Sequence, residues 1–518
     1  MKSPLSPSSL LLFCPLLFLV PAAALADVKL PALISDNMVL LQDTPANVWG
    51  TADPGEQITV KLADKASAQS VADANGHWSV KLSGLTAGEA GEMTISGHNS
   101  ITVKNVAVGE VWVCSGQSNM EMIVQNSANA PEEIAAANHP QIRVFTVQRT
   151  AKAEPQADCA GKWEVCSPAT AGRFTAVGYY FGRHLLENLK VPIGLIHSSW
   201  GGTGAELWTP TDVLAKYQAF KGLFTAWEQT KERYPQAKAE YDAKLATWQE
   251  AAKKAKDEGT RPAPVPRPPH GGDDFGSPGC LYNAMISPLL PYTIRGTIWY
   301  QGEANTGNAA LYENLFPLMI QTWRERWGAG EFPFLYVQLA NFMKRYDEPT
   351  DSNWAALRDA QLKTLDLPHT GMAVTIDIGD ATTVHPTNKQ EVGRRLGLVA
   401  RAAVYYQDVE YSGPMPGGAQ EEDGKIRLTL RFSEGMKSKD GGKLTGFAIA
   451  GDDHKFHWAE AEIQGDHVIV SSPDVPKPVA VRYDWADNPD GNLINETNLP
   501  ASPFRTDDWP QNPPRPER

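Results

Sequence analysis

The chain has 518 residues, which is more than one hydrophobic core usually serves, so about two to four domains are expected. Its 42% hydrophobic and 21% charged residues exclude a mainly disordered protein. With 47 basic against 60 acidic residues the net charge is −13, and no run of Lys and Arg occurs. This balance excludes a typical nucleic-acid binder, which needs a concentrated basic surface.

Residues 1–26 have the pattern of a secretory signal peptide. Lys2 supplies a positive start, residues 10–20 form an apolar run, and Ala-Leu-Ala at 24–26 suits cleavage. The run is short for a membrane span, and no later segment reaches about 18 apolar residues. The sequence therefore predicts an exported protein, periplasmic or secreted, without a membrane span.

Four cysteines follow the signal: Cys114, Cys159, Cys166 and Cys280. An even number in an exported chain permits disulfides, and the short spacing makes Cys159–Cys166 the favoured pair. Since no Cys-x-x-Cys pair occurs, the sequence supports neither a zinc site nor a redox motif.

β-rich segments flank the middle of the chain. Apolar and polar residues alternate over 27–105 between Gly, Asn and Pro turn signals, and short alternating runs return over 411–518. Period-two alternation predicts half-buried strands, so each flank is expected to form a β-sandwich-like domain.

The middle of the chain alternates apolar strands with helical stretches. This order predicts a doubly wound parallel sheet, an α/β fold, from core segments 106–210 and 275–410. Between them, 211–274 is expected to contribute two amphipathic helices and a proline-rich connector as an insertion. The expected strands are 108–115, 193–197, 294–300, 334–339 and 372–376, and the expected helices are 179–189, 312–327, 354–365 and 388–406.

Four motifs follow predicted strands and so share one rim of the sheet, where ligands of such folds bind. Ser118, in Gly-Gln-Ser-Asn-Met, lies at a strand-to-helix turn, where a hydroxyl is exposed beside backbone N–H groups. His385 is a candidate base for it. Trp-Gly-Gly-Thr at 200–203 and Gln-Gly-Glu-Ala-Asn at 301–305 complete the set. Singly, each motif also suits a helix cap, a turn or a solvated loop.

Together these motifs resemble a known family. Gly-Gln-Ser-Asn-Met, Ser-Ser-Trp-Gly-Gly-Thr, Trp-Tyr-Gln-Gly-Glu-Ala-Asn and Val-His-Pro-Thr-Asn-Lys-Gln-Glu-Val-Gly-Arg-Arg-Leu are similar to the sialate O-acetylesterase-like branch of the SGNH (GDSL-type) hydrolases. That branch includes bacterial xyloglucan and other hemicellulose acetylesterases. The resemblance covers both core segments and extends to the two β-rich flanks. It implies an SGNH-type doubly wound sheet.

The resemblance implies a serine nucleophile at Ser118 and a general base at His385. The oxyanion hole would take the backbone N–H of Ser118 and of the Gly201–Gly202 turn. A side-chain amide usually completes it. The family's asparagine position here holds Ala304, so either Gln301 or Asn305 would serve, with a slight preference for Gln301.

The acid partner of the histidine departs from the family pattern. The family's Asp-x-x-His would place an acid at 382, but the residue there is a threonine. Asp380 on the same loop is favoured, Asp377 lies farther back, and Glu303 is an alternative acid on the same rim. A Ser–His dyad supported by backbone carbonyls is also open.

The resulting prediction is an exported esterase that removes O-acetyl groups from carbohydrates through an acetyl-enzyme, without metal or cofactor. Its substrate would be an acetylated oligosaccharide or polysaccharide, such as xyloglucan, or sialic acid. Two alternatives stay open. The 15 tryptophans and two β-rich flanks also suit a non-catalytic carbohydrate-binding protein. A lipase or thioesterase could use the same core.

Overall fold

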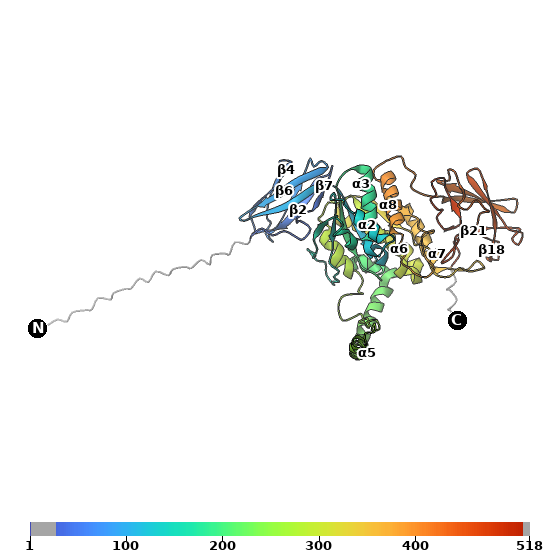
Figure 1. The fold of residues 1–518 in the computed structure, drawn as a ribbon, viewed down its shortest axis with the longest axis horizontal. Coiled ribbons are helices and arrows are strands. Elements are labelled where there is room, and N and C mark those ends of the chain that lie inside the picture. The colour runs from blue at the N-terminus through green and yellow to red at the C-terminus, as the bar shows by residue number, and fades with distance from the viewer. Residues whose placement is uncertain (2–26, 511–518) are drawn as a thin grey trace.

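The computed structural model describes residue 1 and residues 27–510. Within this part, a β domain, a central α/β body and a second β region follow one another from the N-terminal to the C-terminal end (Figure 1). The predicted signal peptide lies outside the described residues. In the described part, no helix is both long and apolar enough to cross a membrane.

The central sheet is mostly parallel, as the apolar strands predicted. β7 (Ser100–Gly116) lies in its middle, between β10 (Ile193–Ser199) and β11 (Gly296–Tyr300). Gly116 is in register with Ser199 on one side and Tyr300 on the other. The three strands therefore end level, and the loops that follow them start side by side. The other strands are β8 (Ile142–Thr146), β9 (Trp163–Val165), β12 (Phe334–Val337) and β13 (Thr370–Ala373).

Four main helices of the central body pack in two pairs: α3 against α8, and α6 against α7. All four begin at a side-chain cap: Thr175 accepts from Gly178 N–H, Asn308 from Leu311 N–H, Ser352 from Ala355 N–H and Asn388 from Glu391 N–H. Their bounds are α3 (Ala176–Leu189), α6 (Ala309–Trp327), α7 (Asn353–Lys363) and α8 (Lys389–Ala403). Short helices near the motif loops are α1 (Ser118–Glu121), α2 (Ala130–Ala136) and α4 (Thr211–Leu214).

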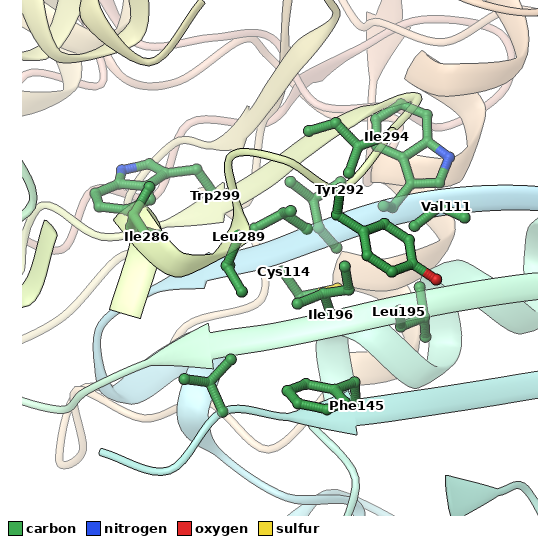
Figure 2. Packing of buried hydrophobic residues seen from close by; sticks show 14 of the residues in the cluster. Val111, Cys114, Phe145, Leu195, Ile196, Ile286, Leu289, Tyr292, Ile294 and Trp299 are labelled. Carbon is green, nitrogen blue, oxygen red and sulfur yellow. The ribbon is translucent and has the colours of Figure 1, made fainter. Parts of the chain in front are cut away.

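The core around the central sheet is rich in buried aromatic rings. Trp112, Trp299 and Trp323 are fully buried, and the Trp299 and Trp323 rings meet edge to face with centroids 5.9 Å apart. Figure 2 shows Trp299 and Tyr292 among buried side chains of β7 and β10, with Phe145 of β8 beside them. This packing makes the central sheet a rigid base for the loops at its edge.

The N-terminal β domain shares a strand with the central body. β7 pairs antiparallel with β6 over its first half and parallel with β10 and β11 over its second half. The boundary expected at residue 105 therefore falls inside one continuous strand. The domain's other strands are β1 (Val39–Leu41), β2 (Ala46–Thr51), β3 (Gln57–Leu62), β4 (Ala66–Val71), β5 (His77–Leu82) and β6 (Gly88–Ser96).

The C-terminal region consists of small antiparallel sheets with a separate hydrophobic cluster. Two four-stranded sheets dominate it, in the orders β14-β15-β20-β19 and β18-β17-β21-β23. The strands are β14 (Met415–Glu422), β15 (Lys425–Arg431), β16 (Lys437–Ser438), β17 (Phe447–Ala450), β18 (Phe456–Trp458), β19 (Glu460–Gln464), β20 (His467–Ser471), β21 (Ala480–Tyr483), β22 (Leu493–Ile494) and β23 (Phe504–Arg505).

The sequence predicted two amphipathic helices in the insertion, whereas the structure has the four-residue α4 followed by one long helix. A single helix, α5 (Lys221–Asp257), fills most of the insertion and projects away from the body (Figure 1). At 1.5 Å per residue its 37 residues span about 55 Å. The proline-rich segment returns along it: Trp248 Nε1 donates to the Ala263 carbonyl at 2.7 Å. The insertion is thus mainly one helical arm, followed by a proline-rich segment without regular secondary structure that returns along it.

The expected disulfide is also absent from the described residues. Cys159 and Cys166, together with Cys114 and Cys280, are free thiols. Cys166 is buried, and its Sγ lies 3.5 Å from the Ala137 carbonyl. Burial raises the pKa of the Cys166 thiol to about 11, so it is protonated at neutral pH.

Candidate active site

Ser118 and His385 meet at the edge of the central sheet. Ser118 begins α1 directly after β7, and His385 lies in the loop between β13 and α8. His385 Nε2 is 2.8 Å from Ser118 Oγ, a hydrogen-bond distance. Residues 267 positions apart in sequence thus form a hydroxyl–imidazole pair, which is the arrangement that nucleophilic catalysis by serine requires.

The environment keeps the imidazole of His385 neutral near pH 7. Burial lowers its pKa below the ordinary value, the charge of Lys389 lowers it further, and Glu121 raises it. A neutral imidazole has a lone pair that can accept the serine proton.

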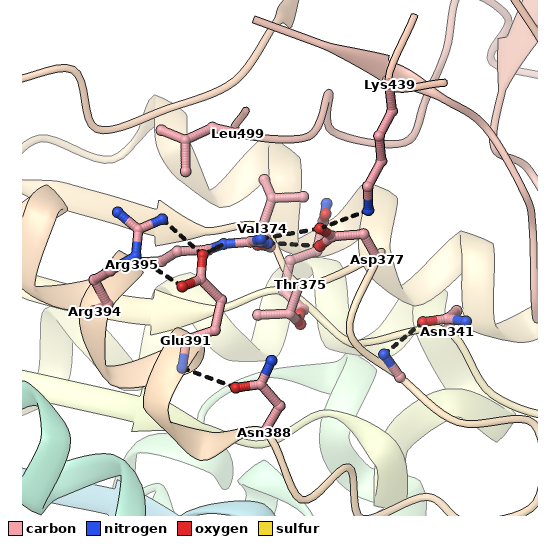
Figure 3. A network of polar contacts seen from close by, with 12 residues as sticks. Asn341, Val374, Thr375, Asp377, Asn388, Glu391, Arg394, Arg395, Lys439 and Leu499 are labelled. Atoms are coloured by element: carbon pink, nitrogen blue, oxygen red, sulfur yellow. Dashed lines mark hydrogen bonds and ion pairs between the residues drawn. The ribbon is translucent and has the colours of Figure 1, made fainter. Parts of the chain in front are cut away.

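The loop that contains His385 is fixed at both ends (Figure 3). Before it, both Asp377 carboxylate oxygens accept from Arg395 of α8, at 2.6 and 3.0 Å. After it, Asn388 caps α8. Arg395 also contacts Glu391, and Lys439 of the C-terminal region approaches Asp377 at 3.9 Å. Asp377 therefore serves as a structural anchor for the loop.

Asp380 does not contact His385. Its Oδ1 accepts from the Thr382 N–H at 2.7 Å and from the Thr382 hydroxyl at 2.6 Å. These bonds lower the pKa of this exposed carboxylate and hold it within its own turn. Among residues 27–510, the His385 ring has Ser118 as its hydrogen-bond partner and no carboxylate on Nδ1. The structure therefore does not assemble the favoured acid with the base.

Glu303 also forms no hydrogen bond with the His385 ring among the described residues, but it belongs to a buried network that reaches the neighbouring Val384. Its Oε1 accepts from Asn119 Nδ2 at 2.5 Å, and the same amide nitrogen donates to the Val384 carbonyl at 3.0 Å. Asn119 Oδ1 accepts from Lys389 Nζ at 2.5 Å. One asparagine thus joins residues next to both Ser118 and His385.

Lys389 of this network carried no assigned role in the sequence, although a signal for it was present. It lies on the apolar stripe of α8 with Val392, Leu396 and Val399, at helical spacing, and its side chain is fully buried. A lysine in such a stripe rarely lacks a partner. Burial lowers its pKa to about 7 and raises that of Glu303.

The glycine turn after β10 lies against Ser118. A Cβ on Gly201 would come 3.2 Å from the Cβ of Ser118, so only a glycine fits without displacement. The Gly201 N–H, however, donates to Glu121 Oε2, whose other oxygen accepts from Arg149 at 2.5 Å. As placed, the Gly201 amide is engaged and does not offer a free donor, whereas Gly202 adopts a φ of 75° in the same turn.

The two candidate amides brace this turn from behind. Gln301 Nε2 donates to the Thr203 carbonyl at 3.2 Å and to Asn305 Oδ1 at 2.6 Å. Asn305 in turn accepts from the Ala205 N–H and donates to Glu206. Both hydrogens of the Gln301 amide are therefore used within the protein, and Gln301 is fully buried. The preference for Gln301 as an oxyanion donor does not agree with this geometry.

Comparison with known proteins identifies the family. The model of "Carbohydrate esterase, sialic acid-specific acetylesterase" matches residues 108–252 and 271–402, more than half of the chain. The chain belongs to this family of carbohydrate esterases. The expected enzyme class, carbohydrate acetylesterase, is confirmed by these matches and those described next.

Curated relatives and a solved structure agree with this family. The sialate O-acetylesterase of Rattus norvegicus is 30% identical, covering 90% of this chain and 92% of the relative. That of Homo sapiens is 28% identical, covering 95% of each. The crystal structure of a carbohydrate acetylesterase from Xanthomonas citri is 39% identical, with a TM-score of 0.79, and covers 93% of this chain and 100% of that one. The similarity thus includes both β-rich flanks.

Proposed function

We propose that this acetylesterase is an SGNH-type serine enzyme that removes O-acetyl groups from a glycan through an acetyl-enzyme. The observation that carries the proposal is the 2.8 Å contact between Ser118 Oγ, just after β7, and His385 Nε2, in the loop that follows β13 of the same sheet. The family description indicates that the substrate carries an acetyl ester, and the Ser118–His385 pair supplies a nucleophile with its base.

In the first step, His385 takes the Ser118 proton while Oγ attacks the acetyl carbonyl. The negative charge on the carbonyl oxygen would be held by the backbone N–H groups of Ser118 and Gly202; the support is that Gly202 follows Gly201, which lies against Ser118. His385 then passes its proton to the sugar oxygen, which leaves. Water then attacks the acetyl carbonyl while His385 takes its proton. The imidazolium returns this proton to Ser118 Oγ as the bond between Oγ and the acetyl carbon breaks and acetate leaves.

We propose that the pair acts as a dyad rather than a triad. The support is that the Asp380 carboxylate is bound to Thr382 and that Asp377 is paired with Arg395. The imidazole is oriented by the fixed ends of its loop and by the Asn119 contact to Val384. A triad with Asp380 would need that carboxylate to leave its turn.

Acetate release tests this function. The purified chain should hydrolyse a chromogenic acetyl ester, and Ser118→Ala should lower turnover by roughly 10⁴–10⁶. Circular dichroism and the unfolding midpoint of the variant should match the parent, because only one oxygen is removed. Full activity of Ser118→Ala would disprove the assignment of the nucleophile.

The natural substrate and the place of action are further proposals. We propose an acetylated plant-type polysaccharide such as xyloglucan for this exported protein, with sialic acid as the second candidate from the curated relatives. The support is the resemblance of the motifs to hemicellulose acetylesterases and the signal-like start of the sequence. Acetate release from a panel of acetylated glycans distinguishes these substrates. A series of esters with increasing acyl chain length tests the lipase alternative, and a preference for acetate is expected.

A further inference from the structure

A recess lies between the central body and the C-terminal region, and neither Ser118 nor His385 is among the residues that line it. One wall comes from the loop before α7, including Pro349 and Asp351, and the other from β18 and β21. Its lining combines aromatic rings with a few polar groups, a composition that is typical of small-ligand sites. The aromatic and charged members are Asp351, His454, Phe456, Trp458, Arg482 and Trp485.

Trp458 is the exposed tryptophan of this recess, whereas Trp485 is buried. The Trp458 side chain is 44% exposed, although large apolar residues are normally buried. Its Nε1 donates to the Asp347 carbonyl at 2.7 Å, which fixes the ring in one orientation. A rigid, partly exposed indole offers a flat apolar face at little entropic cost, and flat faces of this kind suit the C–H face of a sugar ring.

The charges of the recess are compensated within the protein. Arg482 forms two bonds of 2.8 Å with Asp507 and a longer one of 3.4 Å with Asp351. Its guanidinium also lies over the rings of Phe456 and Trp485. Since no uncompensated cation faces the recess among these groups, a neutral ligand fits better than an anion.

The recess is connected to the active-site loop through the backbone. Phe342, at the start of the loop that reaches Asp347, forms a β-bridge with Asp380, five residues before His385. Asn341 Oδ1 accepts from the Gly379 N–H at 2.7 Å. Each five-residue segment spans at most about 18 Å, so the path from Trp458 through Asp347, Phe342 and Asp380 to His385 is at most about 50 Å long, a span that a polysaccharide can bridge.

We propose that this recess is a second binding site, specific for a neutral sugar segment of the same polymer whose acetyl group reaches Ser118. The inference rests on the proposed function for the polymer's presence at Ser118. Trp458 would stack on a sugar ring, and Asp351 and His454 would bind its hydroxyls. Such a site would hold a polymer near the Ser118–His385 pair without touching the reacting ester.

Binding is tested first, with the full chain carrying Ser118→Ala so that no ester is cleaved. Deacetylated xyloglucan is the neutral probe and polygalacturonate the acidic one, titrated by calorimetry. Trp458→Ala should weaken xyloglucan binding about fivefold to tenfold. Trp458→Phe should retain most of it, because the ring remains while the bond to Asp347 is lost. Tyr406→Ala, at a residue 86% exposed elsewhere, is the matched control and should have no effect.

Kinetics then separate this inference from the proposed function. In the active chain, Trp458→Ala should raise KM for acetylated xyloglucan about fivefold and leave hydrolysis of a small chromogenic acetate unchanged. Equal binding by Trp458→Ala and parent, equal losses in the Phe and Ala variants, or a preference for polygalacturonate would each overturn the neutral-sugar site. A parent chain that releases no acetate would refute the proposed function. The binding titration would still decide whether the recess binds a neutral sugar.

Discussion

The ammonium of Lys389 lies 2.5 Å from Oδ1 of Asn119, the residue that follows Ser118 in the chain. Through its other amide atom, Asn119 reaches both Glu303 and the carbonyl of Val384, next to His385. The two halves of the Ser118–His385 pair are therefore joined a second time, one residue away from the reacting atoms. Three of the four sequence motifs meet in this buried network.

Replacing Lys389 by methionine should move the acid limb of the pH–rate profile to higher pH. The Lys389 charge lowers the pKa of His385, so its removal raises that pKa. Only the neutral imidazole accepts the serine proton. With a higher pKa, His385 becomes protonated at a higher pH as the solution is acidified, so activity falls earlier. The variant should also lose about 1–3 kcal/mol of unfolding free energy, because Asn119 and Glu303 lose a buried partner.

The measurement is kcat/KM of a chromogenic acetate against pH, with urea unfolding in parallel. Lys439→Met is a suitable control, since Lys439 is mostly exposed and reaches Asp377 only at 3.9 Å. A Lys389→Met profile that coincides with the parent's would contradict the electrostatic link to His385.

Glu121→Gln should shift the same limb in the opposite direction. The carboxylate of Glu121 raises the pKa of His385, so a neutral amide lowers it and extends activity to more acidic pH. Gln retains an oxygen for the Gly201 N–H, so the turn itself should persist. Opposite shifts in the two charge variants, measured in one buffer series, are the expected result; shifts of the same sign would disprove this assignment.

Much of the central body could be predicted from the sequence because its strands are buried on both faces and read as continuous apolar runs. The expected segment 108–115 is part of β7, and 193–197 is part of β10. Strand ends then place the motifs on one edge by topology alone. Ser118 and His385 followed from this logic.

The remaining features depend on where side chains point and on which hydrogen-bond partners they take, and the periodicity of the sequence shows neither. The Asp380 carboxylate accepts a hydrogen bond from the N–H of Thr382, two residues later, and so it does not reach His385. Closeness to His385 in the sequence does not reveal this local bond. The arm was expected to break into two helices, but Pro235 is accommodated inside α5 among good helix formers. The sequence does not show that both hydrogens of the Gln301 amide are donated within the protein, to the Thr203 carbonyl and to Asn305.

Asp380→Asn tests the dyad. In a serine triad the corresponding change costs about 10⁴ in turnover, because the imidazole adopts the wrong tautomer. Here Asn keeps an Oδ1 that can accept from Thr382, and no contact with His385 is lost. We expect a loss below about tenfold in kcat for a chromogenic acetate. His385→Ala, assayed beside it, should lose orders of magnitude, and a comparable collapse in Asp380→Asn would restore the triad.

Gly201→Ala should impair catalysis far more than folding. The added methyl would lie 3.0 Å from Glu121 Oε2 and 3.2 Å from the Cβ of Ser118, closer than side-chain carbons normally approach. The turn or the serine must therefore shift, and displacements of about 1 Å in such sites cost on the order of 10²-fold in rate.

The matched control is Gly307→Ala, where a methyl would meet no atom within 4 Å and the backbone needs no positive φ. Both variants should unfold at urea concentrations close to the parent's, while only Gly201→Ala loses activity on a chromogenic acetate. Because the turn borders Ser118 rather than a distant sugar, the loss should be the same on a small ester and on a polymer. A loss confined to the polymer would instead assign Gly201 to substrate access.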